Sequence, residues 1–334
     1  MAKIVQFHQL GGPEVLNIEE VPLRPPAEGE VSLRVQAIGL NRAESMFMHG
    51  YYLEPTQLPA TLGYEASGIV TAIGADVDPM WLNKRVSTIP AWSPNQYGVL
   101  GTEVIVPVRA VAEYPSHLTP IEATSIWMQY LTAYGGLVEL GQAKQGEFIL
   151  ITAASSSAGL AAIQIGKAER AITIATTRTG AKRGELLALG ADHVVVTDEE
   201  DLVARVKDIT GGAGARIIFD PIGGPLLDQL AEAAAPGALI VEYGWLSKAP
   251  TPFPLILALQ KALSIRGYWL AEITIHPEHP ERFARAKSYV YDRVKTGQLK
   301  PKIAKTFRFE EVGEAYRYME SNEQIGKIVL SVGE

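Results

Sequence analysis

The sequence contains no cysteine, and this absence alone excludes several kinds of chemistry. Disulfides, catalytic thiols, thiolate zinc clusters and iron–sulfur ligation all require a cysteine sulfur. A reducing compartment therefore fits the sequence best. Because the N-terminus shows no apolar secretory segment, we expect a cytoplasmic protein.

Long apolar runs and an excess of positive charge are also missing. The longest apolar stretch, near 253–259, is far shorter than the roughly 20 residues that cross a bilayer, so no membrane span is expected. The formal net charge of −7 provides no general attraction to nucleic acid or to an anionic membrane. The expected partner is therefore a small molecule.

The chain of 334 residues is long enough for two domains, at roughly 100 to 200 residues each. Its first part is mostly β-like, whereas helical stretches after about residue 121 alternate with apolar segments at 148–152, 171–176, 193–196, 216–219, 238–242 and 263–267. This alternation predicts an α/β protein in which 123–267 form a Rossmann-type, doubly wound parallel sheet. The strand-like C-terminus predicts that 1–122 and 268–334 together form the other domain.

The turn after the first apolar segment has features of a dinucleotide-binding loop. Small residues join the strand to a helix, whose N-terminal amide groups are placed to bind a pyrophosphate. The expected contacts are Ser155, Ser156, Ser157, Ala158 and Gly159. Only Gly159 remains of the usual glycine pattern, so a tight turn that binds nothing is the alternative.

The end of the second apolar segment distinguishes between the two nicotinamide cofactors. NAD-binding proteins usually carry Asp or Glu there, which accepts the ribose 2′-hydroxyl. This chain instead has Thr177, Arg178, Lys182 and Arg183. Because Arg and Lys bind a phosphate and a carboxylate repels it, the sequence predicts NADPH over NADH. Solvated charges at a helix start are the alternative, which the helix macrodipole disfavours.

Five further motifs occur in order along the chain. They are Gly63-Tyr64-Glu65-Ala66-Ser67-Gly68, Leu131-Thr132-Ala133-Tyr134, Gly190-Ala191-Asp192-His193, Asp220-Pro221-Ile222-Gly223-Gly224 and Gly326-Lys327-Ile328-Val329-Leu330. Together they resemble the zinc-independent quinone oxidoreductase branch of the medium-chain dehydrogenase/reductase superfamily. The resemblance implies that the first domain is GroES-like and catalytic. It also implies a homodimer formed through the sheet edge at 263–267, an apolar edge that would otherwise invite aggregation.

The chain departs from the zinc-dependent members of that superfamily at two ligand positions. Where those members have His and Cys, this chain has Tyr64 and Asn41. A phenol and an amide are poor substitutes for imidazole and thiolate on zinc, so neither a zinc ion nor another metal site is expected.

The resemblance also implies which residues contact the reactants. Tyr52 falls where the branch has a substrate-pocket tyrosine, and it is expected to orient the acceptor or to supply a proton. Aromatic packing beside Tyr51 is an equally good interpretation. Asn41 is expected to face the nicotinamide or the substrate. Further cofactor contacts are expected from Gln129, Thr132, Tyr243, Gly244 and Trp245, although core packing would account for several of them.

The leading hypothesis is an NADPH:quinone reductase that delivers a hydride to a small planar electrophile such as a quinone or an enone. One alternative is an NADPH-dependent reductase of carbon–carbon double bonds in enones, alkenals or enoyl thioesters. The second alternative is a non-catalytic NADPH-binding protein. The sequence leaves open the physiological acceptor and whether one electron or a hydride is transferred.

Overall fold

The structure is a computed structural model that describes residues 1–275 and 279–333. Its contacts divide the chain into two units. The first consists of Met1–Met128, Thr274–Glu278 and Pro301–Glu334, and the second of Gln129–Ile273 and His279–Lys300.

These units differ from the predicted domains, 1–122 with 268–334 and 123–267, at both boundaries. Residues 123–128 group with the first unit, where the backbone N–H groups of Trp127 and Met128 donate to Glu65. Helix α10 (Pro280–Lys295) groups with the second unit, in which its Tyr289 hydroxyl donates to Glu169 at 2.6 Å. The two domains as predicted, with those bounds, remain a proposal.

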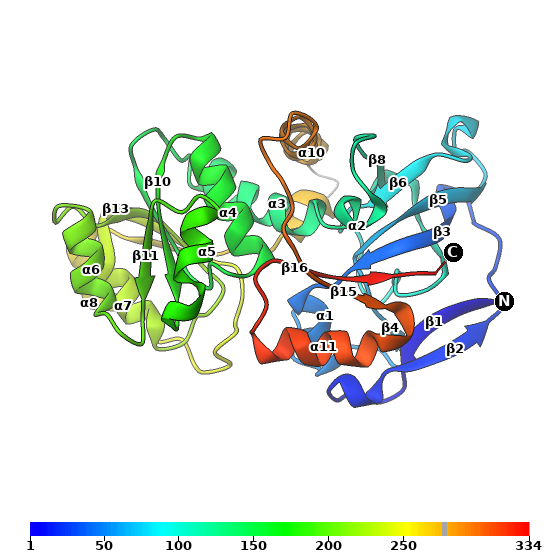
Figure 1. Ribbon diagram of the computed structural model, residues 1–334, viewed down its shortest axis with the longest axis horizontal. Coiled ribbons are helices and arrows are strands. Elements are labelled where there is room, and N and C mark those ends of the chain that lie inside the picture. Colours follow the sequence, from blue (N-terminus) through cyan, green and yellow to red (C-terminus); the bar gives the residue numbers. More distant parts are fainter. Residues whose placement is uncertain (276–278, 334) are drawn as a thin grey trace. The chain divides into compact units, whose positions relative to one another are not determined.

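The first unit is mostly β. Among the described residues, one sheet has the order β15 (Ile303–Arg308), β16 (Lys327–Ser331), β3 (Glu30–Gly39), β5 (Glu65–Ile73), β6 (Arg85–Thr88) and β8 (Val111–Glu113), and β7 (Glu103–Pro107) also pairs with β3. A smaller sheet has the order β2 (Asn17–Val21), β1 (Ala2–Phe7) and β4 (Ala60–Thr61). Its helices are α1 (Arg42–Met48), α2 (Pro120–Ala123) and α11 (Val312–Ser321) (Figure 1). Because β16 pairs with β3, the C-terminal strand completes this unit.

The second unit is built on a parallel sheet (Figure 1). Its order is β11 (His193–Val196), β10 (Ile172–Thr177), β9 (Phe148–Ile151), β12 (Ala215–Asp220), β13 (Ala234–Glu242) and β14 (Ser264–Gly267). Among the described residues, its α-helices are residues 129–134 of α3 (Trp127–Tyr134), α4 (Ser157–Ala168), α5 (Arg183–Ala188), α6 (Leu202–Ile209), α7 (Leu226–Ala233), α8 (Leu255–Lys261), most of α9 (Ala271–Thr274) and α10. Each predicted apolar segment is a strand, and the order confirms the doubly wound fold.

Both faces of this sheet are buried, which explains why its strands are continuous apolar runs. On one face, Leu150, Ile174 and Ile218 pack in a cluster with Val206 of α6 and Leu230 of α7. Helices that cover the faces leave the carboxyl ends of the strands as the edge at which a sheet of this kind binds a ligand.

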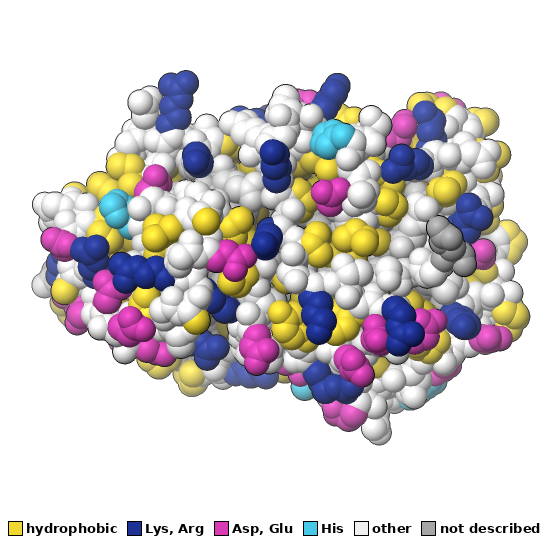
Figure 2. Space-filling view, in the orientation of Figure 1, with side chains coloured by type: hydrophobic (Ala, Val, Ile, Leu, Met, Phe, Trp, Pro, Cys, Tyr) yellow, Lys and Arg dark blue, Asp and Glu magenta, His cyan; other side chains and the backbone are white. Residues whose placement is uncertain are grey.

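The surface carries both signs of charge. On the face shown in Figure 2, basic and acidic side chains are interspersed, with hydrophobic side chains between them. Within residues 1–275 and 279–333, no helix is both long enough and apolar enough to cross a bilayer.

Candidate functional site

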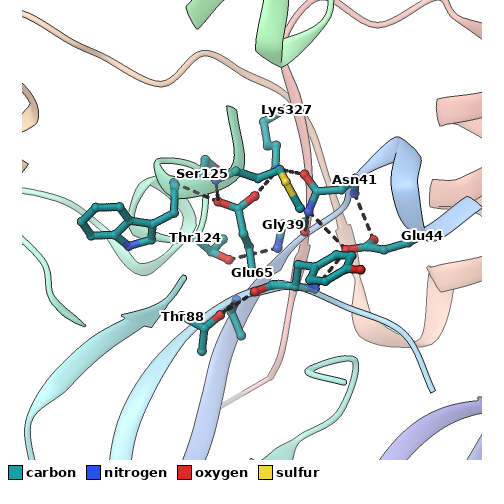
Figure 3. Close-up of polar contacts among 12 residues, drawn as sticks. Gly39, Asn41, Glu44, Glu65, Thr88, Thr124, Ser125 and Lys327 are labelled. Atoms are coloured by element: carbon teal, nitrogen blue, oxygen red, sulfur yellow. Dashed lines mark hydrogen bonds and ion pairs between the residues drawn. The ribbon is translucent and has the colours of Figure 1, made fainter. Parts of the chain in front are cut away.

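A buried ion pair lies at the centre of the candidate site in the first unit (Figure 3). Lys327 of β16 and Glu65 of β5 both have fully buried side chains, and the lysine ammonium contacts Glu65 Oε2. Glu65 Oε1 accepts hydrogen bonds from the N–H groups of Trp127 and Met128 at 2.9 and 2.8 Å, where helix α3 (Trp127–Tyr134) begins. Because a buried charge is costly unless it is paired and hydrogen-bonded, each partner depends on the other.

Asn41 supplies the second acceptor for this lysine. Its Oδ1 accepts from Lys327 Nζ at 2.6 Å, and its Nδ2 donates to the Gly39 carbonyl oxygen at 3.1 Å. A Cβ on Gly39 would lie 2.3 Å from the Thr124 carbonyl oxygen, so only glycine permits this approach. Asn41 therefore positions Lys327, and its expected contact with nicotinamide or substrate remains a prediction.

Glu44 anchors the start of α1 in the same network. Its carboxyl group accepts hydrogen bonds from the Asn41 N–H at 3.0 Å, the Tyr64 N–H at 3.1 Å and the Tyr316 hydroxyl at 2.8 Å. Burial raises the pKa of Glu44, and the hydrogen bonds from Asn41 and Tyr316 oppose that rise. The donors fix the loop before α1 and the segment before β5 to one carboxyl group, which holds Asn41 and Tyr64 in place.

Two tyrosine hydroxyls meet in the first unit. The hydroxyl oxygens of Tyr52 and Tyr64 are 3.5 Å apart. The Tyr64 ring stacks on Trp92 with 6.3 Å between centroids, and the Tyr52 ring packs edge-on against Phe47 at 6.2 Å. Burial is the largest cause that raises the pKa of Tyr64 above its usual value, so its hydroxyl stays protonated. These contacts orient Tyr52. Its catalytic role stays a prediction.

The dinucleotide loop of the second unit lies between β9 and α4. Ser156 is the N-cap of α4, and its Oγ accepts a hydrogen bond from the Gly159 N–H at 3.0 Å. A Cβ on Gly159 would lie 2.6 Å from Ala154 Cα, so the tight turn requires glycine at this position. The first amide groups of a helix have no partners within it and bind anions. The turn therefore fits a pyrophosphate, with Ser155, Ser157 and Ala158 in the same segment.

The predicted cations differ in their surroundings. The Lys182 ammonium donates to Ser155 Oγ at 3.2 Å, which brings it to the dinucleotide loop. Arg178 is exposed directly after β10, next to the buried Thr177. Arg183 lies 3.6 Å from a Glu200 carboxylate oxygen, which partly neutralises it. Lys182 and Arg178 are therefore the stronger candidates for a cofactor phosphate.

Aromatic residues follow the carboxyl end of β13. The Tyr243 ring stacks on Phe219 with centroids 3.9 Å apart, and its hydroxyl lies beside Ser156 of the loop. Trp245 is 39% exposed and donates its indole N–H to the Ala249 carbonyl oxygen at 2.7 Å. At Gly244, a Cβ would lie 2.8 Å from the Pro221 carbonyl oxygen. The segment 243–245 thus lies at the edge where the prediction placed it.

Gln129 and Thr132 lie one turn apart in α3, and both are buried. The Oε1 atom of Gln129 is buried and meets no hydrogen-bond donor among the described residues. An orphaned buried acceptor is costly, and a bound ligand with a hydroxyl group would satisfy it.

Three residues of these sites were not among the expected site residues. Lys327 is visible as a lone lysine that starts an otherwise apolar strand, and Tyr64 as a tyrosine where the resemblance predicts a zinc ligand in other members. Glu242, at the end of β13, hydrogen-bonds to Asp220 at the end of β12. The one sequence feature that could have indicated Glu242 as a site residue is its position at the end of a buried apolar run.

Comparisons with known proteins identify the family and the fold of the chain. The family model described as "Alcohol dehydrogenase GroES-like domain" matches residues 27–116, and "Zinc-binding dehydrogenase" matches residues 158–286. The chain is 30% identical to quinone oxidoreductase 1 of Escherichia coli, over 99% of each protein. It belongs to the quinone oxidoreductase family of the medium-chain dehydrogenase/reductase superfamily.

Other members of the superfamily extend the comparison. The crystal structure of Escherichia coli quinone oxidoreductase complexed with NADPH has a TM-score of 0.90 at 29% identity, covering 98% of this chain and 99% of that one. The 2-haloacrylate reductase of a Burkholderia species is 27% identical over 99% of each protein. A phenolphthiocerol/phthiocerol polyketide synthase polypeptide of Mycobacterium tuberculosis is 29% identical, but this chain spans 15% of its length. The predicted family and fold are confirmed. Because the proteins of this family are oxidoreductases, the chain is an enzyme.

The side chains of this quinone oxidoreductase family member do not fit a zinc ion. This holds although one of the matching family models is described as a zinc-binding dehydrogenase. In the part of the chain that the structure describes, no three His, Cys, Asp or Glu side chains gather as a metal site requires. Asn41, where the resemblance predicts a zinc ligand in other members, accepts a hydrogen bond from the Lys327 ammonium, which is itself a cation. Catalysis without zinc therefore remains a proposal that rests on these donors.

Proposed function

We propose that the protein is an NADPH-dependent, zinc-independent reductase that delivers a hydride to a quinone. The observation that carries this proposal is the Lys182 ammonium beside Ser155 of the dinucleotide loop, because it adds a phosphate-binding cation to a pyrophosphate-binding turn. The family, and the NADPH in the Escherichia coli structure, support the same conclusion. We also infer a cytoplasmic location from the absence of cysteine.

The residues that would hold NADPH divide by chemistry. The loop residues would bind the pyrophosphate, and the cations after β10 would bind the 2′-phosphate. The Oε1 atom of Gln129, which has no donor among the described residues, would suit the nicotinamide half together with polar groups at the end of β13. The proposed set is Asn41, Gln129, Thr132, Ser155, Ser156, Ser157, Ala158, Gly159, Thr177, Arg178, Lys182, Arg183, Tyr243, Gly244 and Trp245.

The two tyrosines would stabilise the acceptor. NADPH, when bound, supplies the hydride, which leaves a negative charge on the oxygen of a quinone or enone. The Tyr52 and Tyr64 hydroxyls are 3.5 Å apart, longer than the usual O–H···O distance of about 2.8 Å, so a single acceptor oxygen between them suits both donors. Tyr52 then gives its proton to complete the hydroquinone, and solvent returns a proton to Tyr52.

A double-bond reductase is the second candidate, because a relative of similar length is named 2-haloacrylate reductase. In that reaction the hydride adds to the carbon–carbon double bond, and the same two hydroxyls would stabilise the enolate before carbon is protonated. The cofactor and the fold are unchanged, and only the acceptor differs.

We also propose that the protein is a homodimer through the edge of the second unit's sheet. Strand β14 forms that edge, and the neighbouring α8 region exposes Phe253, Leu255, Ile256 and Leu259 by 60%, 55%, 64% and 70%. An exposed apolar patch next to an unpaired strand edge is typical of an interface.

The deciding experiment is anaerobic NADPH oxidation against a panel of ortho- and para-quinones, 2-alkenals and enones, with NADH as the control cofactor. Fast quinone turnover with NADPH alone supports the leading proposal. A preference for alkenals or enones transfers the function to double-bond reduction. Tight NADPH binding without turnover of any acceptor contradicts both and supports a non-catalytic NADPH-binding protein.

A further inference from the structure

Two carboxyl groups are neighbours at the ligand edge of the second unit's sheet. Asp220 ends β12, Glu242 ends β13, and the two residues are partners in the parallel pairing of these strands. Strand order reverses between β9 and β12, and a dinucleotide lies across the sheet at such a point. The cations proposed to bind the 2′-phosphate follow β10, on one side of this point. The nicotinamide half of the cofactor is therefore expected on the other side, at the ends of β12 and β13.

Asp220 is the member of the pair that is surrounded by donors. The Thr152 hydroxyl donates to its Oδ1, and the N–H groups of Ile222 and Gly223 donate to its Oδ2 at 3.1 and 2.7 Å. These hydrogen bonds favour the charged form of Asp220 and oppose the rise of its pKa that burial causes. Of the two carboxyl groups, Asp220 is therefore the one on which a negative charge is better stabilised.

Glu242 has the opposite surroundings. Its carboxyl group hydrogen-bonds to Asp220, and its Oε1 atom is buried without a donor in the described residues. Two ionised carboxylates in contact repel each other, whereas a proton on Glu242 supplies the donor that the contact needs. Burial, followed by the charge of Asp220, raises the pKa of Glu242 to about 9. At neutral pH the pair therefore holds one proton, and that proton is on Glu242.

We propose that Glu242 is a cofactor-binding residue that works as a neutral acid, which shares its proton with Asp220 and accepts a hydrogen bond from the nicotinamide carboxamide. This inference rests on the proposed function, since it requires the second unit to bind NADPH. The Oε1 atom of Glu242 meets no donor among the described residues, so it is the acceptor that a ligand's N–H group would satisfy, while the carboxyl group also hydrogen-bonds to Asp220. A second full negative charge at this edge would repel the anionic cofactor, so binding requires the proton.

The consequence is a linkage between NADPH affinity and the ionisation of Glu242. The titratable groups that face Glu242 are Asp220 on β12 and Tyr243, the next residue in the chain. Hydrogen bonds stabilise the negative charge on Asp220, and burial keeps the Tyr243 hydroxyl protonated by raising its pKa. The loss of the Glu242 proton is therefore the event expected to weaken binding as the pH rises above about 9.

The test is the dissociation constant of NADPH, measured by nicotinamide fluorescence at pH 7, 8 and 10, with circular dichroism to establish that each sample is folded. For the unaltered protein, affinity is expected to fall about tenfold between pH 8 and pH 10, as a pKa of about 9 requires. Glu242→Gln keeps a donor toward Asp220 and an acceptor oxygen, so it is expected to match the unaltered protein at pH 7 and to lack the alkaline loss. Glu242→Ala is expected to bind more weakly at every pH.

A matched control is Glu232→Gln, because Glu232 is exposed in the same unit and pairs with Lys207. It is expected to show the unaltered pH dependence. The inference is overturned if Glu242→Gln retains the same alkaline loss, or if it weakens NADPH at pH 7 as much as Glu242→Ala does. If the unaltered protein does not bind NADPH at pH 7, the proposed function fails as well, whereas pH-independent binding overturns this inference alone.

Discussion

Lys327 and Glu65 are 262 positions apart in the sequence, yet they form an ion pair with no exposed side-chain surface on either partner. The pair joins the C-terminal strand β16 to the start of β5, and through Glu65 to the first residues of α3. Asn41 shares the lysine, so the loop before α1 depends on the same pair. The geometry of the first unit's site is thus fixed by a single buried charge pair.

Breaking this pair is expected to destabilise the protein strongly. Lys327→Met leaves the Glu65 carboxylate buried without its cation, and the free energy of unfolding in urea should fall by about 3 to 5 kcal/mol. The double variant Glu65→Gln, Lys327→Met should recover much of that loss, because no unpaired charge remains. The control is Lys84→Met, whose partner Glu113 is exposed, and whose cost should stay below about 1 kcal/mol. If Lys327→Met and Lys84→Met lowered the free energy of unfolding equally, the buried pair would contribute no more to stability than the exposed one.

Removing either of the paired hydroxyls is expected to slow reduction of the acceptor. Tyr52→Phe and Tyr64→Phe keep the ring contacts with Phe47 and Trp92, and each should lower kcat/KM for a quinone or enone by about tenfold to a hundredfold. NADPH affinity should not change. Tyr51→Phe, which keeps the stacking on His49, is the control and should retain normal turnover. Unchanged turnover in Tyr52→Phe removes that residue from the mechanism.

Cofactor preference is expected to depend on the cations after β10. Arg178→Asp and Lys182→Ala should each weaken NADPH by about tenfold or more, and NADH far less, because only NADPH carries the 2′-phosphate. Titration of both cofactors against each variant measures the ratio. Lys207→Ala, in the same unit and paired with Glu232, is the control for a general loss of positive charge. Equal losses for the two cofactors would contradict the assignment.

The stability of the protein is expected to depend on pH through Glu242. In the unfolded chain this carboxyl group ionises near 4.5, whereas in the folded protein it keeps its proton up to about 9. Between these values the unfolded state binds fewer protons, so the free energy of unfolding falls as the pH rises through this window. Glu242→Gln has no carboxyl group that ionises at this position. The melting temperature of the variant, relative to that of the unaltered protein, should therefore rise as the pH increases from about 5 to about 8. A constant difference across that range would be inconsistent with a protonated Glu242.

The state of assembly is expected to depend on the exposed face of α8. Ile256→Glu combined with Leu259→Glu places two charges in the proposed interface and should give a monomer in sedimentation equilibrium at micromolar concentration, while NADPH still binds. Leu187→Glu, at a residue 44% exposed elsewhere in the same unit, is the control and should remain a dimer. If the unaltered protein is itself a monomer at that concentration, the proposed interface is wrong.

Local patterns in the sequence were sufficient to predict the parallel sheet of the second unit. Its strands are short apolar runs separated by helices, and the small residues before Gly159 indicate the turn because glycine permits the approach to Ala154. The order of the strands and the handedness of the connections between them then follow from the general rules of parallel sheets.

The chemistry of the sites could not be predicted in the same way, because it depends on partners brought together by the fold. Lys327 meets Glu65 only after β16 pairs with β3, and nothing near either residue identifies the other. The proton on Glu242 depends on Asp220 in the neighbouring strand. Likewise, Tyr64 meets Tyr52 only when the fold brings the residue before β5 to the segment after α1.

The most direct test of the proposed reaction is single-turnover oxidation of NADPH deuterated at C4, measured anaerobically with a quinone and with an enone. We predict that one of the two C4 deuterium epimers slows the reaction with the preferred acceptor, and that with the enone its deuterium is recovered on carbon in the product. Equal rates for both epimers and for unlabelled NADPH, with no deuterium in the product, would contradict hydride transfer from this cofactor.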